Sequence, residues 1–235
     1  MENKRWTVLV GFAGVVFAFL AAGCASTPSI NVSDQTKATF DGLYPVDGSR
    51  VGRAWARADL DFSGYRKIML QGVGISYRPV KASPRHYAAS STTEFPISAE
   101  RKAELREVLH ESFLKELQKT DRFEFVSEPG ADVLLIRGGL IDVVSRVPPE
   151  SIGRSSVYLS SVGEATLVLE LVDSESETVL IRAVDRRAAE SVGRAVEANR
   201  VSAQMEVRRL ARIWGTLLRE RLEFLADEFN VGADQ

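Results

Sequence analysis

The sequence predicts an α+β fold: a two-layer sandwich in which a mainly antiparallel sheet of about five strands carries two amphipathic helices on one face. Two observations support this prediction. Apolar residues recur at helical spacing in two long segments, one beginning near residue 99 and one near the C-terminus. Several β-rich runs follow one another directly between these segments, which is typical of antiparallel pairing. The order of elements is therefore β-α-β-β-β-β-α.

The first predicted strand covers residues 65–77, YRKIMLQGVGISY, and its centre is apolar on both faces, as in a covered strand. The first helix follows a Ser/Pro-rich stretch. Ser98 offers an N-cap, and Glu100 places a negative charge in the first turn. An apolar stripe then continues through AERKAELREVLHESFLKELQKT at Leu105, Val108, Leu109, Phe113 and Leu117.

The remaining strands are RFEFVSE, ADVLLIRGGLIDVVSR, GEATLVLELVD and TVLIRAVDRRAAE, the last two forming a hairpin across SESE. Gly138 and Gly139 interrupt the second of these strands, and we interpret them as relief for a bulge or for a close helix crossing. A last helix is predicted from about residue 200 to about residue 228. Its apolar face contains Val207, Leu210, Ala211, Trp214, Leu217, Leu218, Leu222 and Leu225.

The chain divides into four parts by composition. Residues 1–23 form a predicted lipoprotein signal peptide, and residues 24–53 form a lipid-anchored flexible tether rich in Ser, Thr, Asp, Gly and Pro. Residues 54–229 form a single α+β domain, and residues 230–235 form a tail. A chain of 235 residues is long enough for one sizeable core, and no internal repeat is visible.

The N-terminus has the layout of an export signal. Lys4 and Arg5 precede an uncharged apolar run from Trp6 to Gly23. A run of this length is at the lower limit for spanning a bilayer, so an uncleaved anchor helix is the alternative. Cys24, which ends the run, is the only cysteine of the chain, so an intramolecular disulfide is excluded.

The segment LAAGC resembles the bacterial lipobox, with small residues directly before Cys24. Leu20 stands four positions ahead of the cysteine, whereas the usual pattern has it three ahead; Ala21 occupies that place. The resemblance implies a diacylglycerol thioether and a palmitate at Cys24, with cleavage before it. Ala25, in place of Asp, implies transfer to the outer membrane, with the domain facing the periplasm. Three acyl chains would make the attachment effectively permanent.

The composition argues against several functions. With 30 basic and 32 acidic residues the charge is nearly balanced, which gives no reason to expect nucleic acid as a partner. Two histidines and one cysteine cannot supply a zinc site rich in those ligands, so we expect neither a metal nor a cofactor.

No catalytic constellation is evident, and we expect a protein that is not an enzyme. His86 lies in the serine-rich segment SPRHYAASSTTE, but no G-x-S-x-G nucleophile elbow appears. His110 falls within the first helix and fits a surface or half-buried position. Glu164 and Glu170 share one strand face but lie roughly 20 Å apart, too far for paired acid–base work.

Arg182, Arg186 and Arg187 are speculative interaction residues on the last strand. Arg186 and Arg187 point to opposite faces unless a bulge intervenes. The alternative is a solvent-facing surface in which opposite charges pair. The two long loops, residues 79–97 and 147–161, are the first places to look for function.

The segments ADLDFSGYRKIML, EPGADVLLIRGGLIDV, GEATLVLELVDSESETVLIRAVDRR and IWGTLLRERL, with the two helices, resemble the bacterial lipoprotein family catalogued as domain of unknown function 3313. The resemblance covers most of the chain from about residue 40 to residue 228. It implies an envelope lipoprotein and supplies no catalytic residues.

Two functional classes follow. The first is a non-catalytic, membrane-tethered interaction or assembly module in the periplasm, whose partner is another envelope protein or a second copy of itself. The alternative is a ligand-binding or hydrolytic lipoprotein that acts on an envelope small molecule or glycan. A deep pocket of several hundred Å³ with convergent polar groups would favour ligand binding, whereas a shallow surface with an exposed apolar patch or a free sheet edge would favour protein partners.

Overall fold

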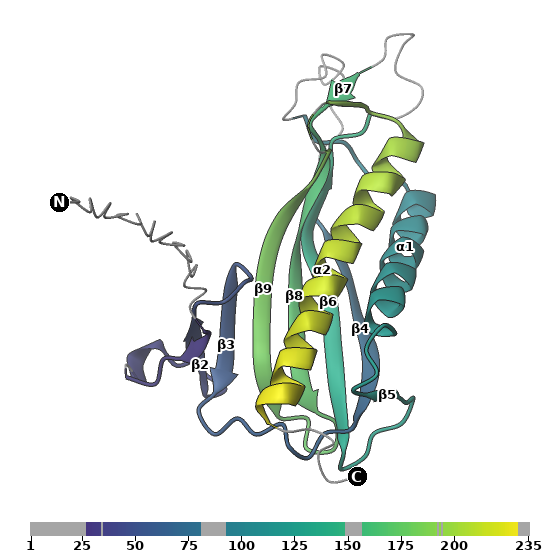
Figure 1. The fold of residues 1–235 in the computed structure, drawn as a ribbon. Helices are drawn as coiled ribbons and strands as arrows, with labels where there is room; N and C mark the ends of the chain where they lie inside the picture. The colour runs from purple at the N-terminus through teal and green to yellow at the C-terminus, as the bar shows by residue number, and fades with distance from the viewer. Residues whose placement is uncertain are drawn as a thin grey trace, which may run out of the picture.

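The computed structural model describes residues 27–33, 35–80, 93–148, 157–191, 193 and 195–229. Figure 1 shows a long twisted sheet with both helices on the same face. Within the described residues, no helix has the length and apolar character needed to cross a membrane. The predicted signal peptide and Cys24 lie outside the described residues.

The sheet contains most of the regular structure. Its strands are β1 (Ser29–Ile30), β2 (Leu43–Asp47), β3 (Arg53–Arg57), β4 (Lys67–Tyr77), β5 (Glu124–Phe125), β6 (Val133–Ser145), β8 (Ser161–Asp173) and β9 (Val179–Glu190). They are arranged in the order β1-β2-β3-β9-β8-β6-β4-β5. β4 runs parallel to both of its neighbours, and all other pairs in this sheet are antiparallel. A second, small sheet pairs β7 (Tyr158–Leu159) with β10 (Val196–Glu197).

The prediction of a sheet of about five strands is therefore wrong. Among the described residues, the main sheet has eight strands, and the two-stranded sheet is additional. The unexpected strands of the main sheet are β1, β2 and β3. The apolar pattern of the sequence does not predict these strands because they are short, and because β2 contains Pro45 in the sequence LYPVD. Proline is tolerated there because β2 has only the two-residue β1 on its outer side.

Residues 24–53 are, in their described part, more ordered than a flexible tether. β1, a 3₁₀ turn at Gln35–Lys37 and β2 all fall within this range. Leu43 is fully buried, and Asn31 donates its backbone N–H to the carbonyl of Pro45 at 2.8 Å. The folded part of the chain therefore begins well before residue 54.

Both predicted helices are confirmed at their expected positions. α1 (Ala99–Leu117) begins after Ser98, whose side chain accepts a hydrogen bond from the Arg101 N–H. α2 (Arg200–Glu228) begins after Asn199, which forms a reciprocal capping box with Ser202. Each cap satisfies backbone donors that the first helical turn leaves free.

The core lies between the sheet and the helices, in two apolar clusters. The first joins Phe62, Ile68 and Leu134 to Leu222 of α2, and the second surrounds Trp214 of α2. The helices cross at Gly215, where an added Cβ would lie 2.9 Å from the Cβ of Glu116. The absence of a side chain at this crossing lets the two helices approach closely.

Candidate functional site

Arg182 lies in a ladder of charged side chains across the sheet face opposite the helices. It contacts Glu170 on β8 through Nε at 2.8 Å and Asp41, in the turn before β2, through Nη2 at 2.6 Å. Arg137 on β6 reaches the other carboxylate oxygen of Glu170 at 3.0 Å. The Arg182 guanidinium lowers the pKa of Asp41, so that carboxylate is ionised at neutral pH. Arg182 therefore connects the N-terminal turn to the sheet.

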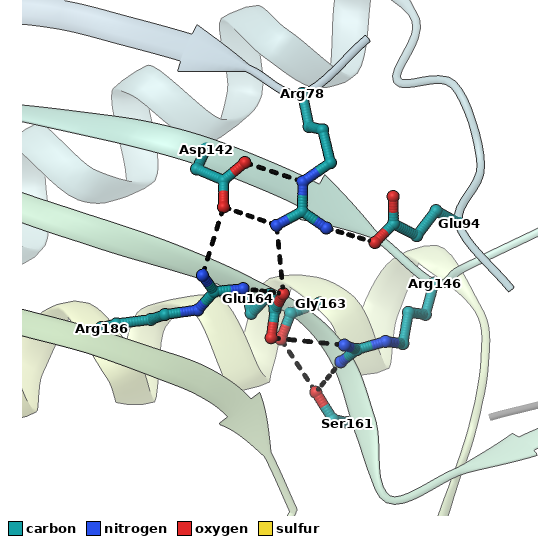
Figure 2. A network of polar contacts seen from close by, with 8 residues as sticks. All are labelled: Arg78, Glu94, Asp142, Arg146, Ser161, Gly163, Glu164 and Arg186. Carbon is teal, nitrogen blue, oxygen red and sulfur yellow. Dashed lines mark hydrogen bonds and ion pairs between the residues drawn. The ribbon is translucent and has the colours of Figure 1, made fainter. Parts of the chain in front are cut away.

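Arg186 belongs to a second network, shown in Figure 2, where the strand ends of β4, β6 and β8 meet. Its guanidinium contacts Glu164 at 2.5 Å and Asp142 at 3.4 Å. Arg78 binds Asp142 through two hydrogen bonds of 2.7 and 2.5 Å and also contacts Glu94 at 2.5 Å. Three arginines, including Arg146, thus share three carboxylates, and the network is neutral overall.

The network depends on irregular backbone. Asp142 adopts φ 56°, a left-handed conformation, at a register shift between β6 and β8. Hydrogen bonding from Arg78 lowers the pKa of Asp142. Burial raises the pKa of Glu164, but hydrogen bonds and charge from Arg186 and Arg146 outweigh burial and lower it overall. Both carboxylates are therefore ionised at neutral pH and hold the strand ends together.

Arg187 points to the other face of β9 and contacts the buried carboxylate of Asp185 at 2.5 Å. Asp185 also accepts hydrogen bonds from the indole N–H of Trp214 at 2.8 Å and from the backbone N–H of Gly52 at 2.9 Å. Arg182, Arg186 and Arg187 are thus brought to three different ion-pair groups rather than to one patch. Their role as interaction residues stays a prediction, and their contacts account for them structurally.

Several features that the sequence predicts lie outside the described residues. Cys24, His86 and most of the two long loops, at residues 81–92 and 149–156, fall outside the described residues. Among the residues described, no group of three or more His, Cys, Asp or Glu side chains is placed to hold a metal ion.

A cavity of about 300 Å³ that opens to solvent lies beneath α1, and glycines of β4 and β6 form part of its lining. Gly72 on β4 is the register partner of Gly138 on β6. The positions two residues earlier, Leu70 and Ile136, are also partners and belong to the apolar core under the helices. Because side chains alternate between faces, Gly72 and Gly138 face α1 with no side chain to fill the space.

The surroundings of these glycines show that the space is open. A Cβ added at Gly72 would meet nothing within 4 Å, and one at Gly138 would approach only Leu169, at 3.9 Å. Neither residue has the positive φ that requires glycine. Close packing and backbone strain therefore do not explain these two glycines, whereas an unfilled cavity does.

The walls of the cavity are apolar and its polar groups are few. α1 contributes Leu109, Phe113 and Leu114, and the sheet and α2 contribute Leu140, Leu167, Leu169 and Leu218. Arg106 and His110 also line the cavity and are exposed to solvent, so they lie at its mouth. An apolar chamber with a polar, cation-bearing mouth is suited to an amphipathic ligand.

The mouth lies near an open edge of the sheet. A wider surface depression shares Leu70, Gln71, His110 and Leu114 with the cavity and continues along the segment after β5. β5 pairs with β4 only at Lys67 and Ile68. Among the described residues, no strand pairs with the outer side of β4 beyond this point.

Sequence reasoning missed the cavity, although the β4–β6 ladder does contain a register shift opposite Gly138 and Gly139, as one of the two interpretations of these glycines predicts. The segments GVG and RGGL were visible, and a bulge is present in β4 between Gly72 and Gly74. The helix above Gly138, however, does not approach closely. Pairs of glycines in two different strands would have been a useful signal only if the parallel β4–β6 pairing had been known. His110, expected as a simple helix-surface residue, lies at the mouth of the cavity.

Several solved structures are similar to this chain, at low identity and with TM-scores below 0.5. A dodecameric PelC from Paraburkholderia phytofirmans shares 8% identity with a TM-score of 0.33, covering 71% of this chain and 95% of that chain. A Xanthomonas campestris protein of the family DUF330 shares 9% identity with a TM-score of 0.39, covering 74% and 92%. A putative neuraminyllactose-binding hemagglutinin homolog from Helicobacter pylori shares 12% identity with a TM-score of 0.38, covering 70% and 91%.

No curated protein sequence matches this chain. One family model does, and it covers residues 33–218, which is most of the chain and includes every strand from β2 to β10. The family resemblance inferred from the strand and helix segments is thereby confirmed. The chain belongs to the family described as protein of unknown function DUF3313.

Proposed function

We propose that this protein is a lipid-anchored protein of the bacterial envelope that binds a small amphipathic ligand beneath α1 and does not act as an enzyme. The observation that carries the proposal is the 300 Å³ apolar cavity above Gly72 and Gly138. Its volume is at the lower end of the range of ligand sites, roughly 300–1,000 Å³.

The lining of the cavity indicates the chemistry of the ligand. The aliphatic and aromatic walls suit an acyl chain or a fused ring system. At the mouth, the guanidinium of Arg106 can pair with an anionic head group, and His110 can add a hydrogen bond. We therefore expect a ligand with one apolar body and one negatively charged end.

The first prediction is that filling the cavity weakens ligand binding. The anionic dye 1-anilinonaphthalene-8-sulfonate has the expected chemistry, and its fluorescence rises in apolar surroundings. We expect saturable binding to the wild type and an affinity at least about tenfold lower for Gly72→Leu, because the leucine side chain enters the open space.

Gly64→Leu is the matched control. Gly64 also has nothing within 4 Å of an added Cβ, but it does not line the cavity. This variant should bind the dye like the wild type. Arg106→Gln should weaken binding of the sulfonate dye but not of the neutral N-phenyl-1-naphthylamine. Equal dye affinity in the wild type and Gly72→Leu would rule out the cavity as the site.

The envelope location rests on the N-terminal sequence. The charged Lys4 and Arg5, the apolar run and the small residues before Cys24 support export and acylation. Ala25 supports the outer membrane as the destination, with the domain in the periplasm. The ordered segment that follows, from β1 onward, would then be held close to the membrane.

The second prediction concerns this anchor. Cells grown with labelled palmitate should incorporate the label into the wild-type protein and not into Cys24→Ser, which should leave the membrane fraction. Ser26→Ala, a neighbouring change that preserves the cysteine, should remain labelled and membrane-bound. A wild-type protein that takes up no palmitate and stays in the membrane would instead support the uncleaved helix.

A second candidate function is supported by the edge of β4. β4 has eleven residues but pairs with β5 at only two positions, and an open edge can accept a strand from a partner protein or a second copy. The bulges of β4 near Gly72 and Ile75 interrupt this edge. If Gly72→Leu leaves dye binding unchanged, an interaction module acting through this edge becomes the better proposal.

A further inference from the structure

Phe40 is the most exposed large apolar side chain among the described residues, with 99% of its surface accessible. It lies in the N-terminal lobe, by which we mean residues 31–33 and 35–42, between β1 and β2. Val32, in the same lobe, is 51% exposed. In Figure 1 the lobe projects beyond the edge of the sheet, away from the helices.

The exposure of Phe40 does not come from a loose backbone. Thr39 donates its N–H to the Leu43 carbonyl at 2.8 Å, and the Thr39 hydroxyl accepts the Leu43 N–H at 2.9 Å. On the other side, Asp41 is held by Arg182 of β9 at 2.6 Å. The residues on both sides of Phe40 are therefore fixed to the domain, and the turn presents the ring to the outside.

The distance to the anchor determines what the ring faces. Ser29, the first residue of β1, is five positions after Cys24. An extended chain of this length spans at most about 17 Å. The N-terminal lobe follows β1 directly and begins at Asn31, seven positions after Cys24. A longer tether would have let the domain move far from the bilayer, whereas this short one keeps the lobe close to it.

We propose that the N-terminal lobe rests on the membrane and that Phe40 inserts into the headgroup region of the lipid bilayer. The proposal depends on the acylated Cys24 of the proposed function. Aromatic rings favour the membrane interface, and the lipid anchor has already met the translational entropy cost of bringing this one to the bilayer. The lobe thereby fixes the orientation of the sheet relative to the membrane.

The test uses the acylated protein reconstituted in vesicles of phosphatidylethanolamine and phosphatidylglycerol. Because the single native cysteine is blocked by lipid, Phe40→Cys provides the only free thiol for a nitroxide spin label. Tyr158→Cys is the matched control, since Tyr158 is also an exposed aromatic residue, 64% accessible, and lies on β7 at the far end of the sheet.

For each label we compare two relaxation effects, one from lipid-soluble oxygen and one from a water-soluble nickel chelate. We expect the ratio of the oxygen effect to the nickel effect to be severalfold higher at position 40 than at position 158. Equal water exposure at both positions would overturn the proposal, as would shielding of position 40 from both agents, which would indicate a protein partner. Two measurements made before labelling distinguish a missing anchor from a failure of this proposal. A chain without acyl groups would show an unmodified Cys24 by mass spectrometry and would not cosediment with vesicles.

Discussion

Trp214→Ala is expected to destabilise the protein by about 3–5 kcal/mol. Trp214 is 1% exposed and is the largest fully buried side chain among the described residues. It fills the second apolar cluster between α2 and the sheet, so truncation leaves a large cavity. For a domain of this size, such a loss lowers the melting temperature by roughly 10 °C, which thermal unfolding followed by circular dichroism would detect.

Trp214→Phe separates packing from hydrogen bonding. Phenylalanine retains much of the buried ring but cannot donate to Asp185, which keeps its contacts with Gly52 and Arg187. We expect this variant to lose about 1–3 kcal/mol, less than the alanine variant. If both variants lost the same amount, the hydrogen bond to Asp185, and not the packing of the indole, would be the main contribution.

Gly163→Ala is expected to have the second-largest effect, a loss of about 3 kcal/mol, at the upper end for overpacking. An added Cβ at Gly163 would lie 2.3 Å from the carbonyl oxygen of Val144. That atom belongs to the backbone of β6, so β6 and β8 must separate. The carbonyl of Gly163 also accepts a hydrogen bond from Ser161 within the network of Figure 2, which the separation would disturb.

Gly72→Ala is the control for this change, because it adds the same methyl group in a strand of the same sheet. Gly72 has an ordinary φ and open space around it, and replacing a strand glycine relieves about 0.5–1 kcal/mol of conformational entropy. In urea unfolding, we expect the slope of the unfolding free energy against urea concentration to stay the same in both variants. Relative to the wild type, the midpoint should be lower for Gly163→Ala and equal or higher for Gly72→Ala. An unchanged midpoint for Gly163→Ala would mean that β6 and β8 are further apart than described.

The sequence predicted the elements whose side chains repeat over several turns or pleats. α1 and α2 were found with their N-terminal boundaries, and β4, β6, β8 and β9 with boundaries within a few residues, because each has a long apolar periodicity. β1, β2 and β3 were missed because strands of two to five residues contain too few repeats for a pattern. β9, the partner that joins β3 to the rest of the sheet, lies so far along the chain that no local signal indicates the pairing.

The candidate site was harder to predict than the fold for the same reason. A glycine in one strand indicates nothing about a cavity until its register partner is known, and Gly72 pairs with Gly138 only through the parallel β4–β6 ladder. The arginines of β9 were visible as charges, but their partners come from other elements, such as Asp41 before β2 and Glu164 on β8. Composition gives the number of charges, and only the topology determines which of them meet.

The pairing of β3 with β9 has a consequence for how the chain folds. Arg53 of β3 pairs with Val184 of β9, so the three N-terminal strands cannot join the sheet until nearly the whole chain is available. The β8–β9 hairpin and the helices need only nearby partners and can form early. If the chain enters its compartment N-terminus first, β1, β2 and β3 can pair with one another, but the free edge of β3 must wait for β9. Closing such a long loop is slow, and during this interval the strands are open to aggregation or to a chaperone.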